Sequence, residues 1–275
     1  MVRRPFLLLA VLLAGCGSSQ TAAPTEPEPP APTTDTAPPA TTSIVVYFLR
    51  GETLAPVHRV VPQTAAVGTA AVTALLDGPT ATESDFDVSS TVPEGTRLLG
   101  LDVADGTATV DLSREFESGG GSLSMTARLA ELVFTLTQFS TVDRVQLELE
   151  GEPVSVFGGE GIVIDEPLTR EDFVDLMPII LVERPALGET VSSPVQVRGT
   201  ASVFEATLHV RLVGPGGEEI RDEVVTASEG APGRGTFSVE IPFSASGAGI
   251  VEAFTLSAAD GSEQHGVQVP VELAP

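Results

Sequence analysis

The chain has 275 residues, with 38 acidic against 14 basic side chains and a net charge of −24, and every basic side chain is arginine. This charge excludes a nucleic-acid-binding protein, since phosphates demand basic patches, and it disfavours binding to anionic lipid by charge. The single cysteine, Cys16, excludes an internal disulfide and a cysteine-based metal site.

The first 15 residues are predicted to be a signal peptide. Arg3 and Arg4 precede a short apolar run at residues 6–13, shorter than the ~20 residues that span a bilayer. Residues 13–16, LAGC, resemble a bacterial lipobox, in which cleavage falls between Gly15 and Cys16 and the cysteine thiol carries lipid. We therefore expect Cys16 to anchor the chain at the extracytoplasmic face of the cell membrane. A soluble secreted protein with a stray cysteine is the alternative.

Residues 16–42 are expected to be a lipidated cysteine followed by a disordered linker. Residues 17–42 contain seven prolines and seven threonines and almost nothing to bury, which is typical of extended, unfolded chain. Removal of residues 1–15 leaves 12 arginines against the 38 acidic residues, a net charge of −26. A solvated acidic surface is the favoured interpretation of this charge over calcium binding.

Residues 43–175 alternate between strand and helix patterns, which predicts an α+β domain. Residues 43–49, SIVVYFL, are β-branched and aromatic and indicate a buried strand. The sequence DGP at residues 77–79 ends a helix. One face of that helix carries Val67, Ala70, Ala71, Ala74 and Leu75.

A hairpin, a second helix and a last strand follow. Asp105-Gly106 predicts a tight hairpin turn, and residues 142–151 predict a strand. Ser122 or Ser124 is expected to cap the second helix. The apolar stripe of this helix carries Met125, Leu129, Leu132, Val133 and Leu136. The order β-α-β-β-α-β predicts a sheet with two helices packed on one side.

Residues 176–275 show short strands and Gly/Pro turns, which predicts an all-β sandwich. In PVQVRGTA, Val195 and Val197 point one way while Gln196 and Arg198 point the other. The junction at residues 170–185 is apolar enough to predict a packed interface between the two domains.

These segments resemble two known families. Residues 44–173 are similar to the GerMN module of sporulation and spore germination, through ALLDGPT (74–80), residues 92–116, residues 129–139, residues 145–154 and PLTREDF (167–173). Residues 178–273 resemble the immunoglobulin-like domain of bacterial spore germination proteins, through residues 184–212, GTFSVEIPF and SAADGSEQHGVQVPVEL. The resemblance implies an α+β domain followed by a β-sandwich in a bacterial lipoprotein. It supplies no catalytic residues and no cofactor.

No motif in the sequence indicates an enzyme, a metal site or a cofactor. His58, His209 and His265 are scattered singly and predict no zinc site. Asp85 and Asp87 have the chemistry for acid/base work or for calcium, but no third ligand stands at EF-hand spacing. In VFEA, residues 203–206, Phe204 is expected to fill the sandwich core and Glu205 to begin a strand.

Three functions remain open from the sequence. The favoured one is a non-catalytic, lipid-anchored envelope protein whose domains bind an envelope protein or cell-wall material. The second is a self-assembling component that forms a homo-oligomer or ring, which the repulsion between like-charged copies disfavours. The third is a cell-wall-acting enzyme, which needs a convergent polar cleft.

Overall fold

The computed structural model describes residues 40–159 and 161–275. The predicted signal peptide, its cleavage site at Gly15 and the lipidation site at Cys16 lie outside the described residues. Strand β1 (Thr41–Arg50) begins two residues earlier than the expected residue 43. The reason is that Thr41 and Thr42 pair with the end of strand β2 (Thr53–Pro62).

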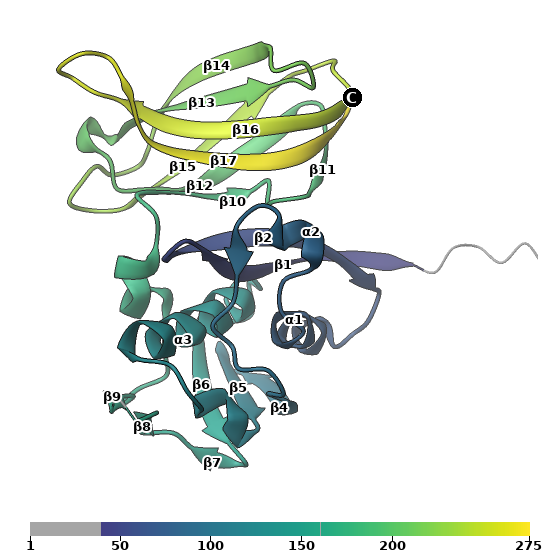
Figure 1. The fold of residues 1–275 in the computed structure, drawn as a ribbon, viewed down its shortest axis with the longest axis vertical. Helices are drawn as coiled ribbons and strands as arrows, with labels where there is room; N and C mark the ends of the chain where they lie inside the picture. The colour runs from purple at the N-terminus through teal and green to yellow at the C-terminus, as the bar shows by residue number, and fades with distance from the viewer. Residues whose placement is uncertain (1–39, 160) are drawn as a thin grey trace, which may run out of the picture. The chain divides into compact units, whose positions relative to one another are not determined.

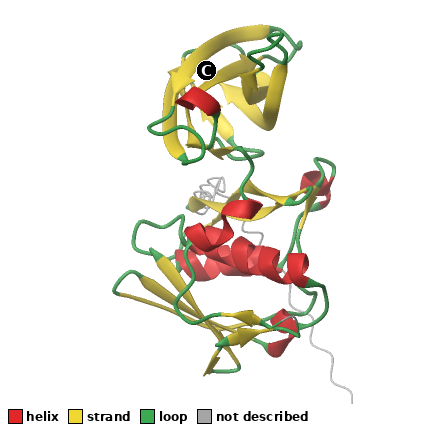
Figure 2. Ribbon diagram, turned by 90° about the vertical axis from the view of Figure 1, so that its left-hand side faces the viewer, coloured by secondary structure: helices red, strands yellow, loops and turns green. Residues whose placement is uncertain are grey.

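The first region consists of two larger sheets with helices between them (Figures 1 and 2), and of a separate two-stranded sheet, β8-β9. One sheet has the order β2-β1-β3 and the other has the order β4-β5-β6-β7. Helices α1 and α3 each contact β1 of the first sheet and one strand of the second. The α+β class is confirmed, but the layers differ from the expected single sheet with helices on one side. The remaining elements of this region are α1 (Val67–Leu76), α2 (Ala81–Ser84), β3 (Val88–Ser89), β4 (Leu98–Ala104), β5 (Thr107–Leu112), η1 (Arg114–Glu117), α3 (Ser122–Leu136), β6 (Arg144–Leu149), β7 (Glu152–Pro153), β8 (Val156–Phe157), β9 (Ile162–Val163) and η2 (Arg170–Leu176).

From residue 127 to residue 136, helix α3 is buried on every side because it lies between the two sheets. The predicted stripe is buried, and so are Ala127, Arg128, Ala130 and Glu131 on other faces. A helix that is covered all round needs no polar face, which is why a single stripe underestimates its burial. The predicted caps are wrong: the N-cap residue is Gly121, and Ser122 and Ser124 lie inside the helix.

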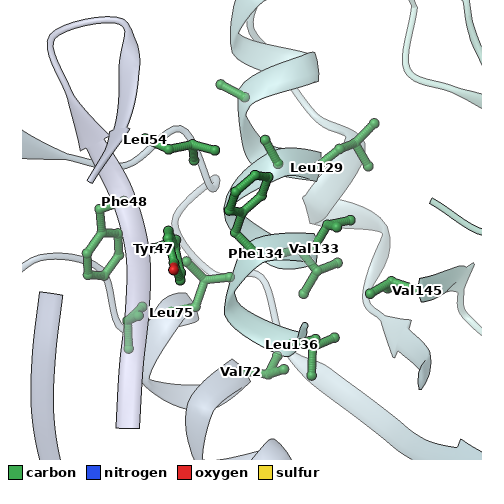
Figure 3. Close-up of a cluster of buried hydrophobic side chains, with 14 of the residues drawn as sticks. Tyr47, Phe48, Leu54, Val72, Leu75, Leu129, Val133, Phe134, Leu136 and Val145 are labelled. Atoms are coloured by element: carbon green, nitrogen blue, oxygen red, sulfur yellow. The ribbon is translucent and has the colours of Figure 1, made fainter. Parts of the chain in front are cut away.

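The core of this region gathers side chains from β1, β2, α1, α3 and β6 (Figure 3). The hairpin predicted at Asp105-Gly106 is confirmed, since both residues have positive φ (50° and 77°) and join β4 to β5. Strand β2 was not predicted from its sequence, TLAPVHRVVP. Its prolines are tolerated because β2 is the outer strand of its sheet.

Helix α3 also covers the open edge of β1. The Tyr47 amide donates to Thr135 Oγ1 at 3.0 Å, and the Val45 amide donates to Gln138 Oε1 at 2.8 Å. The Gln138 amide nitrogen donates back to the Val45 carbonyl. Side chains at the end of the helix thus replace a neighbouring strand and satisfy backbone groups that would otherwise be unpaired.

The second region is the expected all-β sandwich. Its two sheets have the orders β10-β12-β15 and β11-β17-β16-β13-β14. Val195 and Val197 are buried while Gln196 and Arg198 are exposed, so the predicted alternation is confirmed. Its elements are β10 (Ile180–Arg184), β11 (Thr190–Ser192), β12 (Val195–Ala201), η3 (Phe204–Ala206), β13 (Thr207–Val213), β14 (Glu219–Thr226), β15 (Gly235–Ile241), β16 (Gly247–Leu256) and β17 (Glu263–Ala274).

The junction between the regions is packed and hydrogen-bonded, as the apolar sequence at residues 170–185 predicts. All described residues belong to one compact unit. Leu176, Leu181 and Leu187 are buried in the core of the first region. The His58 amide donates to the Leu187 carbonyl at 2.9 Å, and the Leu187 amide donates to the Pro56 carbonyl at 3.1 Å. The outer edge of β2 is therefore covered by a residue that follows β10.

Candidate functional site

A cluster of three polar side chains lies where helix η2, strand β1 and strand β10 meet. Arg170 donates through Nε to Thr137 Oγ1 at 2.8 Å and through Nη1 to Glu183 Oε1. Tyr47 donates its hydroxyl to the same Glu183 oxygen at 3.3 Å. The Arg170 guanidinium also lies over the rings of Tyr47 and Phe134, 5.4 and 4.6 Å from their centroids. These contacts fix Arg170 in one position.

Burial and the neighbouring charges hold these groups in one protonation state. Burial raises the pKa of Tyr47, and the Glu183 carboxylate adds to the effect, so the phenol stays neutral. Burial alone would lower the pKa of Arg170, but the interactions with Tyr47 and Glu183 raise it overall. Arg170 is therefore a permanent cation and Tyr47 a permanent hydrogen-bond donor.

Two further arginines stand beside this cluster, on the outer face of the β10-β12-β15 sheet. Arg184 of β10 lies directly opposite Arg198 of β12. The pairing shifts between Val182 and Arg184, which marks a bulge at Glu183. A bulge lets two successive residues face the same side, so Glu183 and Arg184 both line one cleft. Arg184 donates to Glu189 Oε1 at 2.9 Å.

The three arginines line one open cleft of about 710 Å³, which we call the arginine cleft. Its lining is mostly polar and comes from both regions of the chain. The residues that line it are Val45, Tyr47, Thr137, Gln138, Arg170, Glu183, Arg184, Gln196, Arg198, Gly199, Thr226, Ser228, Thr236, Phe237 and Ser238. Such a lining favours binding of a polar or charged ligand.

Phe204 does not fill the sandwich core, contrary to the expectation. Its side chain is 79% exposed, and the preceding residue, Val203, is buried instead. Glu205 and Ala206 follow with φ of 55° and 56°, so Glu205 belongs to a left-handed turn and does not begin a strand. The Ala227 amide holds the turn by donating to the Ala206 carbonyl at 2.8 Å.

Replacing Phe204 with alanine is expected to change the free energy of unfolding by less than ~0.5 kcal/mol, because its ring is already in solvent. The matched change Phe237→Ala, in the same sandwich, should cost ~3–5 kcal/mol, since Phe237 is 4% exposed. Thermal unfolding followed by circular dichroism measures both. A large loss of unfolding free energy for Phe204→Ala would mean that Phe204 packs in the core.

The histidines and aspartates singled out from the sequence do not form a metal site. His209 and His265 line a hollow of about 600 Å³ beside Phe204, and His58 is not in it. The His209 ring is hydrogen-bonded through Nδ1 to Asp222 Oδ1 at 3.0 Å, and it stacks on the Phe254 ring. Among residues 40–159 and 161–275, no group of three or more His, Cys, Asp or Glu side chains is placed to hold a metal ion.

The two aspartates of ESDFDV serve local structure. Asp85 is the C-cap residue of α2, and Asp87 has a positive φ of 61°. Both are exposed. Within the described part of the chain, neither side chain has a hydrogen bond or an ion pair that would prepare it for catalysis or metal binding.

The residues of the arginine cleft were not predicted as a site. Arg170 was noted within the apolar junction and within PLTREDF, and Arg198 as an outward-facing strand residue in the segment 184–212; neither was predicted as a site residue. The sequence did contain one signal for the cleft, because the strand alternation predicts that Gln196 and Arg198 point outward. Which residue of another strand lies opposite them depends on sheet register, which a single sequence does not reveal.

Comparisons with known proteins match the two regions separately. A family described as "Sporulation and spore germination" (Germane) matches residues 45–155. A family described as "Immunoglobulin-like domain of bacterial spore germination" (Gmad2) matches residues 179–262. No curated protein matches the chain significantly.

Solved structures that resemble the chain include sporulation proteins. The tandem GerMN domains of the sporulation protein GerM from Bacillus subtilis are 17% identical, with a TM-score of 0.42, over 74% of this chain and 62% of that one. The chain thus spans less than two thirds of that structure. The first GerMN domain of the same protein is 22% identical over 48% of this chain and 99% of that one, with a TM-score of 0.39. A candidate lipoprotein from Clostridium perfringens is 22% identical over 54% of this chain and 98% of that one, with a TM-score of 0.37.

None of the described helices is long and apolar enough to span a membrane.

Proposed function

Because the chain combines a sporulation and spore germination domain with an immunoglobulin-like domain of bacterial spore germination, we propose that it is a non-catalytic, lipid-anchored protein of the cell envelope that binds a partner there. In this proposal Cys16 carries the lipid and residues 17–42 form a tether. The folded regions then face the extracytoplasmic space.

The observation that carries the binding function is the arginine cleft. It is built from both regions, with Tyr47 and Arg170 on one side and Arg184 and Arg198 on the other. Main-chain hydrogen bonds between β2 and Leu187 connect the two regions across the junction. A polar cleft of about 710 Å³ that is built in this way is large enough to receive a small ligand or the end of a polymer.

The chemistry of the cleft supports binding over catalysis. A general base needs a carboxylate or imidazole that is free to accept a proton. The Glu183 carboxylate already accepts hydrogen bonds from Arg170 and Tyr47, and Glu189 accepts one from Arg184. The high pKa of Tyr47 keeps its phenol from acting as a base. Permanent cations and neutral donors are suited to holding an anion.

The anchor is tested by replacing Cys16 with alanine in the full-length chain expressed in a bacterium. The native chain is expected to incorporate labelled palmitate and to sediment with the membrane fraction. The variant should lose the label and leave the membrane fraction, because two or three acyl chains supply stable attachment.

Ser18→Ala, two residues beyond the cysteine, is the matched control and should keep both the label and the membrane location. If the Cys16 variant sediments with membranes as the native chain does, and neither protein is labelled, the chain is not a lipoprotein and the proposed location fails.

A further inference from the structure

The arginine cleft contains a pair of like charges at neighbouring positions of one sheet. Arg184 and Arg198 occupy directly opposite positions in neighbouring antiparallel strands. Like charges at opposite positions of a sheet destabilise it. Acidic side chains outnumber basic ones 38 to 14 in this chain, so an acidic neighbour would be the expected arrangement. The pair is readily understood if an anion from outside the chain lies between the two guanidinium groups.

The charges of the cleft leave room for one negative charge. Three arginines line it, and two glutamates neutralise two of them: Glu183 on Arg170 and Glu189 on Arg184. The third, Arg198, is exposed, and no ion pair or hydrogen bond joins its guanidinium group to any other described residue. Arg198 therefore offers an unpaired positive charge to an anionic group, in a chain of net charge −24.

Other donors stand free beside Arg198. Ser238 of β15 is paired with Arg198 across the sheet, and Gln196 lies two residues along the same strand. Both are exposed and line the cleft, and among the described residues neither side chain makes a hydrogen bond. A hydroxyl and an amide next to a guanidinium are suited to a ligand that carries hydroxyl or amide groups next to its charge.

We propose that the arginine cleft binds the carboxylate of a cell-wall ligand between Arg184 and Arg198, with Gln196 and Ser238 holding its neighbouring polar groups. The proposal rests on the envelope function proposed above and names the class of ligand. A carboxylate fits because the forked guanidinium can donate two parallel hydrogen bonds to it, and because Arg170 and Arg184 already pair with side-chain carboxylates. In the wall this group comes from the lactyl ether of the glycan or from the end of the peptide.

The test is calorimetric titration of the full-length chain in detergent with matched probes. N-acetylmuramic acid and N-acetylglucosamine differ by the carboxylate-bearing lactyl group, so the first is expected to bind at least ~10-fold more tightly. An acetylated D-alanyl-D-alanine peptide tests the peptide source, and glycerol phosphate tests the competing anion. Binding of either carboxylate probe should weaken as salt is added.

Arg198→Ala is expected to weaken carboxylate binding on the order of 10-fold without lowering the temperature of unfolding, because it removes a like-charge contact. Arg198→Lys keeps the charge but loses the fork, and should bind with intermediate affinity. Arg221→Ala removes an exposed arginine that is paired with Glu223 on β14, and should bind as the native chain does.

Binding of either carboxylate probe with dependence on Arg198 supports the proposal and identifies its source. Tighter binding of glycerol phosphate than of both carboxylate probes, equal binding of the two sugars without binding of the peptide, no binding of either carboxylate probe, or no effect of Arg198→Ala overturns it. The Cys16 experiment is unaffected by these results, so failure of the ligand class is distinguishable from failure of the envelope location.

Discussion

Replacing Phe134 with alanine is expected to lower the free energy of unfolding of the first region by ~3–5 kcal/mol. Phe134 lies in the last turn of α3 and is 0% exposed. Its ring packs against Tyr47 (Figure 3), with 5.3 Å between the ring centroids. The Arg170 guanidinium lies over the face of the Phe134 ring. Because α3 is held by a sheet on each side, the neighbours have little freedom to collapse into the space that the ring leaves.

The chain provides its own probe for this measurement. It has one tyrosine and no tryptophan, and that tyrosine is Tyr47, in direct contact with Phe134. Tyrosine fluorescence during urea unfolding therefore reports on this core and not on the sandwich. The control is Leu123→Ala on the same helix, where the side chain is 51% exposed and the loss should stay near zero. A loss below ~1 kcal/mol for Phe134→Ala would mean that the two sheets do not confine α3.

The same substitution should also disturb the arginine cleft. Arg170 is positioned by the rings of Tyr47 and Phe134 and by Thr137 and Glu183. Loss of the Phe134 ring removes one of these supports, so the guanidinium is expected to become more mobile. Helix α3 therefore links the stability of the first core to the position of Arg170 in the cleft, because its Phe134 contributes to both.

Local patterns predicted the elements of the fold better than their layering. The hairpin at Asp105-Gly106 and the alternation at residues 195–198 depend on neighbours in sequence, and both are confirmed. The enclosure of α3 depends on a sheet separate from β4-β5-β6-β7, formed by β1 with β2 and β3. The prolines, His58 and Arg59 of β2 kept it from being predicted as a strand. A sequence pattern shows which face of an element is apolar but does not show how many partners cover it.

Phe204 shows a second limit of prediction from the sequence. A large aromatic residue beside buried strand positions is usually part of a core, and here the preceding Val203 takes the inward position. The two left-handed residues that follow, Glu205 and Ala206, are not glycines, so nothing in the residue types indicates the turn. The turn is fixed by long-range bonds from Ala227 and Ala231.

The candidate site could not be predicted from the sequence for a related reason. Tyr47, Arg170, Arg184 and Arg198 come from separate segments, and the motifs that contain three of them indicate a family but not a site. Their meeting depends on the packing of the junction and on the β-bulge at Glu183. The sequence predicted a packed junction, but the cleft beside it required the register of two strands.

Glu131→Gln is expected to remove a pH dependence from the stability of the first region. Glu131 lies on α3 and is 0% exposed. Its carboxylate accepts hydrogen bonds from the Thr91 amide at 2.8 Å, the Thr91 hydroxyl at 2.7 Å and the Ser90 hydroxyl. Burial raises its pKa from the ordinary 4.5 to about 7, although these hydrogen bonds and the nearby Arg128 oppose the shift.

The direction of this pH dependence follows from the protons that Glu131 binds in the folded and in the unfolded chain. Between pH 4.5 and about 7 the folded chain holds a proton on Glu131 that the unfolded chain has released. The contribution of Glu131 to stability is therefore fully present below pH 4.5 and is lost as the pH rises through about 7. At 1.36 kcal/mol per pH unit, the loss across this window is on the order of 3 kcal/mol.

The experiment compares the native chain with Glu131→Gln by urea unfolding from pH 4 to pH 8, followed by Tyr47 fluorescence. Glutamine does not titrate, so the stability of the variant relative to the native chain should rise across this range by about the amount that Glu131 loses. Glu94→Gln removes one carboxylate from the exposed surface and should not reproduce that rise. If the difference between Glu131→Gln and the native chain is the same at pH 4 and pH 8, the carboxylate of Glu131 is not buried in the folded chain and α3 is not enclosed at this face.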